Sequence, residues 1–324
     1  MIEYNYQDMD LGVFSLNLWG ERGLKEKFTE SRLFLDGLLL FVCLFWGMAY
    51  IWSKQVTDLG MGPNAYLAVR YLTSALILIP FFWKKIRQTT KQELFQAVCL
   101  GLLVYAAMVT QLIGLRYTTV ANSAFITAAY VAVVPFVSWA MFRQKPASRS
   151  LIAVVLCIAG LYVLNVGPGG LKINLGNAIT LVCALCWSVQ VPLMSYAGRT
   201  ASTETLTVVP ILVAGTLGAV VGAVRHEFVF TGTALHTLFW PVLLSILFPT
   251  IFSGTAQAYV QKHISPTRAA IIYTTESVFA CLMSALLGLE GLTPQLLLGG
   301  GLIMGGVLLS ELPIKNLFLR RNSP

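Results

Sequence analysis

Two charged side chains lie deep within apolar stretches of the sequence, where a bilayer would leave them without water. Glu276 is the one charged residue of residues 269–289, and Arg70 is the one charged residue of the apolar run 64–83. A charged group at the centre of a bilayer costs at least about 2.5–3.5 kcal/mol, so such residues face a protein interior or water. Glu276 is therefore a candidate for contact with a bound amine or for proton exchange, and Arg70 for contact with a bound solute.

Each of these charges also has a purely structural interpretation. Glu276 would then be a structural acid that hydrogen-bonds neighbouring Ser, Thr or Tyr side chains. Arg70 would be a helix-packing residue, or one that extends its charge toward the membrane surface. On a helix, Ala269, Tyr273 and Ala280 share the face of Glu276, and these small or polar neighbours favour an inward orientation. The two charges are expected about 10 Å apart along the membrane normal, so a direct ion pair needs help from side-chain reach.

Aromatic and amide side chains form a second group within the apolar runs. Aromatic faces combined with uncharged amides suit a pocket for amphipathic organic molecules. The alternative is helix–helix hydrogen bonding together with aromatic residues at the membrane interface. As a set, these residues predict a cavity between the first, third, fourth, sixth, eighth and ninth apolar runs. The candidate binding residues are Trp46, Tyr50, Arg70, Tyr105, Gln111, Asn122, Tyr130, Trp187, Gln190, Gln257, Tyr273 and Glu276.

Catalytic, metal and cofactor motifs are not found. The pair Cys183-x-x-Cys186 has no nearby histidine or second cysteine pair with the spacing of a metal site. The turn "GPGG" at 167–170 lacks the Gly-Lys-Ser/Thr ending of a phosphate-binding loop. The apolar runs hold no Asp dyad, no Ser with His and no zinc-protease motif, which an intramembrane enzyme would need. The sequence therefore predicts no catalytic residue, no metal and no cofactor.

The composition is that of a membrane protein. Only 11% of the 324 residues are charged, against roughly 25% in soluble domains, and the mean hydropathy is +0.74. The apolar runs are about 20 residues long, enough to cross a bilayer, and they do not alternate with the period of two of an outer-membrane barrel. We predict an all-α polytopic membrane protein with ten transmembrane helices. The predicted spans are residues 34–53, 64–83, 94–114, 121–142, 149–166, 176–196, 204–224, 239–259, 269–288 and 294–312.

Positive charge is strongly biased to one side of these spans. With the N-terminus in the cytoplasm, 17 Lys and Arg residues fall on the inner side and four on the outer side. This bias predicts that both termini are cytoplasmic. The net charge of +8 lies in short clusters between spans, which argues for a lipid bilayer and against nucleic acid as the partner.

A turn-rich joint at 166–176 separates five spans from five. Because five is odd, two repeated halves would enter the membrane with opposite orientation, as in many secondary transporters. Residues 111–162 overlay 257–308 without a gap and pair Gln111 with Gln257 and Gly160 with Gly306. Two small-residue motifs, Gly218-x3-Gly222 and Gly301-x3-Gly305, predict close helix approach. The predicted organisation is a leader (1–32), a first repeat (33–166), a joint (167–175), a second repeat (176–312) and a tail (313–324).

Several segments, in this order, resemble the EamA-type family of the drug/metabolite transporter superfamily. The family's opening Trp-Gly motif stands in "LFWGMAYIWSK", its second-span arginine in "AYLAVRYLTSALIL", and its fourth-span pattern in "YTTVANSAFITAAYVAVVPF". The second-half pattern stands in "ISPTRAAIIYTTESVFACLMSALLGLEGLTPQLLLGGGLIMGGVLL". The resemblance covers roughly residues 34–312. The chain departs from the family pattern at Ser277, where the family usually has Pro, and at Gln144, where it usually has an acid.

The resemblance implies a secondary transporter that exports amino acids or similar small organic metabolites or drugs. It would work by alternating access in the inner (plasma) membrane. Protons are the candidate coupling ion. The runner-up interpretation is a membrane receptor or scaffold, which predicts an apolar interior without a continuous polar cavity. An intramembrane enzyme is the weaker alternative.

Overall fold

The fold is almost entirely helical. The computed structural model describes residues 32–143, 148–167, 170–171, 174–228, 232–264, 269 and 272–311. The predicted leader and tail lie outside these residues, except for Arg32. At the predicted joint, β1 (Val166–Gly167) and β2 (Gly170–Leu171) form a two-residue antiparallel pair.

The predicted all-helical membrane class is confirmed. Within the described residues, seven helices are long and apolar enough to cross a bilayer, and shorter apolar helices accompany them. The first part of the chain forms α2 (Arg32–Asp58), α3 (Pro63–Ile86), α4 (Lys91–Leu115), α5 (Val120–Ala128), α6 (Tyr130–Phe142) and α7 (Ser148–Asn165). The second part forms α8 (Leu175–Ala197), α9 (Thr203–Val224), α10 (Gly232–Ser245), the π-helix η1 (Ile246–Phe252), α11 (Ser253–Val260), α13 (Thr275–Leu286) and α14 (Pro294–Glu311).

Local sequence explains where several helices begin. Pro63 occupies the first turn of α3, where its missing N–H leaves no bond unmade. Thr90 and Glu93 form a capping box at the start of α4, in which each side chain accepts a hydrogen bond from the other residue's backbone N–H. Ser202 accepts from the backbone N–H of Thr205 at the start of α9. Helices α4 and α9 therefore begin at polar caps that flank the apolar runs.

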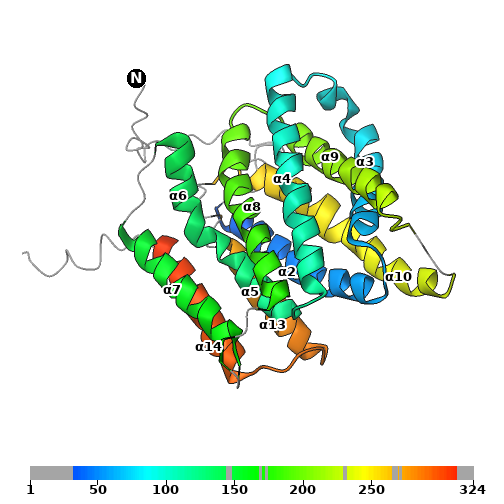
Figure 1. The fold of residues 1–324 in the computed structure, drawn as a ribbon. Helices are drawn as coiled ribbons and strands as arrows, with labels where there is room; N and C mark the ends of the chain where they lie inside the picture. The colour runs from blue at the N-terminus through cyan, green and yellow to red at the C-terminus, as the bar shows by residue number, and fades with distance from the viewer. Residues whose placement is uncertain are drawn as a thin grey trace, which may run out of the picture.

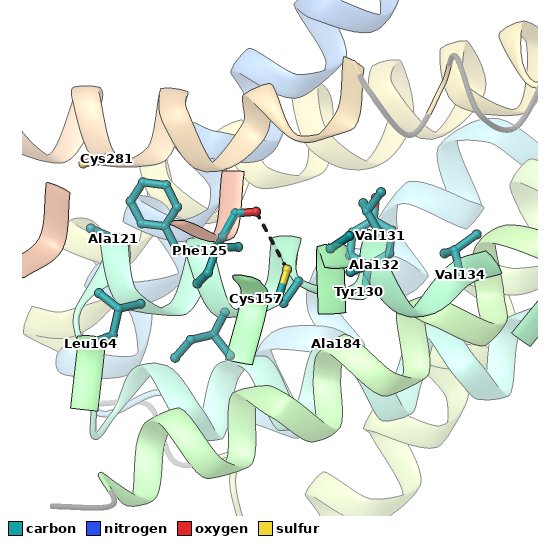
Figure 2. Close-up of a cluster of buried hydrophobic side chains, with 14 of the residues drawn as sticks. Ala121, Phe125, Tyr130, Val131, Ala132, Val134, Cys157, Leu164, Ala184 and Cys281 are labelled. Atoms are coloured by element: carbon teal, nitrogen blue, oxygen red, sulfur yellow. Dashed lines mark hydrogen bonds between the residues drawn. The ribbon is translucent and has the colours of Figure 1, made fainter. Parts of the chain in front are cut away.

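The helices pack side by side around a central region (Figure 1). Helices α7 and α14 lie against each other at one edge, and α3 packs against α9 at the other. Between these edges, α4 packs on α8 and α2 packs on α13. The cluster at the first edge includes Phe125 and Cys157, and the Cys157 Sγ lies 3.8 Å from the carbonyl oxygen of Ile303 (Figure 2).

Glycines set the distance between the helices at both edges. A Cβ at Gly218 would lie 2.9 Å from the Asn64 carbonyl oxygen, and one at Gly222 would lie 3.2 Å from the Ala65 nitrogen. The predicted close approach at Gly218 and Gly222 is therefore confirmed, and the partner helix is α3.

The prediction of close helix approach at Gly301 and Gly305 is wrong. A Cβ at Gly301 or at Gly305 would meet nothing within 4 Å. The contact with α7 is made instead by Gly299 and Gly306, where a Cβ would lie 3.0 Å from the Gly160 carbonyl oxygen and 2.8 Å from the Ala153 carbonyl oxygen, respectively. Glycines lie on several faces of α14, so their spacing in the sequence does not reveal which face meets α7.

This difference predicts opposite effects for two adjacent substitutions. Gly306→Leu should destabilise the protein by about 1–3 kcal/mol or more, because the backbone of α7 blocks its Cβ. Gly305→Leu should leave stability nearly unchanged, because its side chain enters open space. Thermal unfolding of both variants in one detergent checks the prediction, and equal midpoints would contradict the packing of α7 on α14.

Candidate functional site

A cavity of about 130 Å³ lies inside the helix bundle. Helices α2, α3, α4, α8, α9, η1 and α11 line it, together with residues near the α5–α6 junction and the start of α13. The structure brings ten of the twelve sequence-predicted residues to this cavity: Trp46, Tyr50, Arg70, Gln111, Tyr130, Trp187, Gln190, Gln257, Tyr273 and Glu276.

The other two predicted residues lie elsewhere. The Tyr105 hydroxyl donates a 2.7 Å hydrogen bond to Oδ1 of Asn64, near the start of α3. Asn122 lines a separate depression beside Glu290. Both residues lie on apolar runs that do reach the cavity, but on helix faces that point away from it. The structure therefore does not bring Tyr105 or Asn122 to the predicted binding site.

The set of helices around the cavity is also wider than predicted. The sequence indicated the first, third, fourth, sixth, eighth and ninth runs, yet α9 contributes Leu206, Thr207, Pro210 and Ile211. Helix α3 contributes Tyr71 as well as Arg70. The second and seventh runs must therefore be added to the predicted lining.

Glu276 lies in the first turn of α13 and faces the cavity. The Tyr50 side chain lies next to its carboxyl group. Nε2 of Gln111 donates a 3.0 Å hydrogen bond to the Tyr50 hydroxyl oxygen, which leaves the hydroxyl proton available for an acceptor. No ion pair of Glu276 occurs among the described residues.

Gly47 brings α2 close to this turn of α13. A Cβ at Gly47 would lie 2.8 Å from the Ala280 nitrogen, 2.9 Å from the Phe279 Cβ and 3.1 Å from the Glu276 carbonyl oxygen. Backbone atoms block two of these directions, so no side-chain rotation makes room. The Trp-Gly pair thus places Trp46 in the cavity wall while Gly47 admits the helix that carries Glu276.

Arg70 is 3% exposed and is held by α3 and η1. Its Nε donates a 2.7 Å hydrogen bond to Oγ1 of Thr250, and the Thr250 hydroxyl donates to the Ser245 carbonyl oxygen at 2.8 Å. Its Cζ lies 5.2 Å from the Tyr71 ring centroid and 5.9 Å from that of Tyr66. This burial excludes the interpretation of Arg70 as a residue extending to the membrane surface.

Trp46 joins the aromatic wall of the cavity to η1. Its indole Nε1 donates a 3.3 Å hydrogen bond to the Pro249 carbonyl oxygen. Its ring lies 5.4 Å from that of Tyr273, centroid to centroid. Short π-helical segments occur frequently at functional sites. Here η1 presents both the Pro249 carbonyl and the Thr250 hydroxyl to cavity residues.

Two further helix interruptions lie at the cavity. Helix α5 ends at Ala128 and α6 begins at Tyr130, with Ala129 between them. A turn at Thr274 precedes α13. Thr127 and Tyr130 flank the first interruption, Tyr273 and Glu276 flank the second, and all four side chains line the cavity. Ala129 and Thr274 both keep right-handed helical backbone angles, so each interruption is a one-residue irregularity in a helix that continues through it.

The cavity extends toward one end of the bundle and is closed at the other. It reaches Met194 near the end of α8, Leu206 near the start of α9 and Gln257 near the end of α11. At the opposite end, two carboxylates from loops of the second half cap helices of the first half. Glu227 accepts from the backbone N–H groups of Asn64 (2.7 Å) and Ala65 (3.3 Å) at the start of α3.

Glu290 makes the equivalent contact at α5. Its carboxylate accepts hydrogen bonds from the backbone N–H groups of Val120 and Ala121, the latter at 3.1 Å. Near these caps, the Thr118 hydroxyl donates to Oδ1 of Asn177. The closed end is thus held by polar contacts between the two halves of the chain.

Sequence reasoning missed several lining residues. Thr250 and Thr207 are small hydroxyl residues that are common in membrane helices, and Tyr71 lies beside the arginine that was selected. Met108 and Ile211 are apolar and carry no sequence feature that separates a cavity wall from a lipid-facing or packed position. Helical spacing from Trp46 and Tyr50 would have been a usable guide only with the helix orientations known.

These features define a multi-pass membrane protein with a solute-sized cavity between the halves of its chain. The chain belongs to the EamA-like transporter family, whose model matches residues 33–166 and 174–312. It is 28% identical over 290 residues to an uncharacterized transporter of Archaeoglobus fulgidus, covering 88% of each chain. It is 26% identical over 297 residues to the uncharacterized inner membrane transporter YedA of Escherichia coli K12, covering 86% of this chain and 90% of the relative.

A solved structure shows the same fold. One crystal structure superposes with a TM-score of 0.64 at 16% identity, covering 86% of this chain and 97% of the other. The family and the names of the relatives make this chain a membrane transporter and favour that class over an enzyme.

Proposed function

We propose that this protein is a secondary transporter that exports amino acids or similar small organic metabolites or drugs by alternating access. The observation that carries the proposal is the internal cavity, to which both halves of the chain contribute polar and aromatic side chains. The ten lining residues predicted from the sequence are the proposed solute contacts. A receptor or scaffold would leave such a polar cavity unexplained, so transport is the better interpretation.

Inverted halves, residues 33–166 and 176–312, are part of this proposal. The offset that pairs Gln111 with Gln257 also pairs Thr127 with Tyr273 and Tyr130 with Glu276. Each of these pairs joins two cavity residues, and the last two pairs flank the interruptions before α6 and α13. Cavity residues and one-residue helix irregularities in corresponding positions of the two halves support a binding site at the interface of inverted repeats.

The contact between α7 and α14 supports the same symmetry. The offset pairs Gly160 with Gly306 and Ala153 with Gly299. A Cβ at Gly160 would meet the Gly299 carbonyl oxygen at 2.6 Å, and a Cβ at Gly306 would meet the Ala153 carbonyl oxygen at 2.8 Å. Exchanging the halves thus converts one contact into the other, as expected for a two-fold axis between inverted repeats.

The proposed location is the inner membrane, with both termini in the cytoplasm. The excess of Lys and Arg on one side supports this orientation, and the printed name of YedA supports this membrane. In that orientation the cavity reaches the cytoplasmic end, and the caps made by Glu227 and Glu290 close the outer end. A solute from the cytoplasm would therefore enter the conformation described here.

Transport by the purified protein is the direct test. Inside-out vesicles or liposomes that contain the protein should accumulate a radiolabelled amino acid from a panel above the level of protein-free liposomes. The matched control is Gly47→Leu, which should fold poorly at the cavity and accumulate no more than empty liposomes. Failure of the unmodified protein to move any of a broad panel of amino acids, small metabolites and drugs would reject the proposal.

A further inference from the structure

We infer that Arg70 is a subsite for a carboxylate, so that the solutes bound in this cavity are carboxylic acids. The inference rests on the proposed function, because it names the solute class of the same cavity. It also states which side chain distinguishes an acid from a neutral or cationic solute of equal size.

The first step is the unbalanced charge of Arg70. A guanidinium stays charged in proteins, and this one is 97% buried with its Nη1 lacking any hydrogen-bond partner. Among the described residues, ion pairs join Lys54 to Asp58 and Arg225 to Glu227, and none involves Arg70. The rings of Tyr66 and Tyr71 stabilise the cation by their faces but accept no conventional hydrogen bond from its edge. Glu276 lines the same cavity but forms no ion pair with Arg70, and a buried charge without a partner in contact is expensive to maintain, a cost typical of functional positions.

The second step is the fixed orientation of the guanidinium. Its Nε is bound to Thr250, whose own hydroxyl proton is bound to the Ser245 carbonyl oxygen. Ser245 is in turn fixed by the Tyr66 hydroxyl at 2.7 Å. This chain of hydrogen bonds anchors one nitrogen of the guanidinium. The terminal Nη1 is buried and has no hydrogen-bond partner, so a carboxylate would reach it only after the side chains that cover it shift. Two parallel N–H groups of an arginine match the two oxygens of a carboxylate.

The third step is the surroundings of the cation. The same cavity is lined by Tyr71, Met108, Trp187 and Ile211, which offer aromatic and apolar surface next to the charge. Its volume of about 130 Å³ is close to the roughly 150 Å³ of an apolar cavity that holds benzene. A small acid with one flat apolar group therefore matches the cavity in both size and polarity. Benzoate is such a probe, and benzamide is its neutral counterpart of nearly equal shape.

The experiment compares binding of benzoate, benzamide and benzylamine to the purified full-length protein by calorimetric titration at constant ionic strength. Benzoate should bind at least about tenfold more tightly than benzamide, because it alone forms a charge-assisted pair with the guanidinium, whereas benzylamine reports on the carboxylate of Glu276 in the same cavity. In Arg70→Gln the preference for benzoate over benzamide should fall to about one. Arg225→Gln, which removes an exposed arginine outside the cavity, should retain the preference of the unmodified protein.

The unmodified protein decides the inference even where Arg70→Gln does not fold. Equal binding of benzoate and benzamide, or binding of neither, would overturn the carboxylate subsite. An acid preference that persists in Arg70→Gln, or in Arg70→Lys at full strength, would also overturn it. Transport of a neutral or cationic solute in the vesicle assay would meanwhile leave the proposed transport function standing, so the two failures are distinguishable.

Discussion

Replacing Gly47 with alanine should both destabilise the protein and reduce transport. One added methyl group would lie 2.8 Å from a backbone nitrogen of α13, which forces α2 and α13 apart. Overpacking of this kind costs about 1–3 kcal/mol. The displaced turn carries Glu276, so transport should fall by more than the loss of folded protein explains. Thermal unfolding in detergent measures the loss of stability. Vesicle transport per amount of folded protein measures the loss of transport.

Gly37 provides the matched control on the same helix. A Cβ at Gly37 would meet nothing within 4 Å, so Gly37→Ala should be neutral or should stabilise α2 by about 0.5–1 kcal/mol. Transport by this variant should equal that of the unmodified protein. Equal stability and transport for Gly47→Ala and Gly37→Ala would show that α13 does not depend on the close approach at Gly47.

Replacing Glu276 with glutamine should remove most of the pH dependence of transport. Among the described residues, Glu276 is the one carboxylate that lines the cavity, and the substitution keeps its size while removing its ability to exchange a proton. Loss of this exchange should reduce accumulation driven by a proton gradient at least about tenfold, which corresponds to about 1.4 kcal/mol of lost coupling. Vesicle transport measured over a range of pH, with and without a gradient, tests the expectation.

Asp58→Asn is the control for removal of a carboxylate. Asp58 lies outside the cavity and forms an exposed ion pair with Lys54, at 3.1 Å, that contributes little to stability. Its pH profile should match that of the unmodified protein. An unchanged pH profile of transport in Glu276→Gln would instead assign Glu276 a structural role, as an acid that hydrogen-bonds neighbouring side chains.

The helical membrane class was predictable because most of the described helices coincide with a long apolar run of the sequence. The helix interruptions at Ala129 and Thr274 and the π-helix at Ile246–Phe252 were not predicted. No proline or glycine stands at Ala129 or Thr274, so their sequence context is that of a continuous helix. The face of α14 that meets α7 was misjudged because it depends on the partner helix.

The cavity was predictable where a residue type is costly in lipid. Glu276, Arg70 and Gln111 have to avoid hydrocarbon, so their inward orientation follows from their chemistry. Tyr105 and Asn122 are also polar, yet they satisfy their hydrogen bonds or solvation near the end of the bundle that Glu227 and Glu290 close. Polarity therefore predicts that a residue leaves the lipid and does not predict which interior or surface it reaches. Orientation about the helix axis supplies that information, and it comes from packing.

The contacts of Glu227 and Glu290 have a consequence for the energetics of the proposed cycle. In a state that opens the outer end, the N–H groups at the starts of α3 and α5 would exchange these carboxylates for water. Loss of a helix cap costs about 0.5–2 kcal/mol, so two caps that release together would oppose opening of this end by roughly twice that amount. The contacts that close the other end would have to offset this cost in each transport cycle.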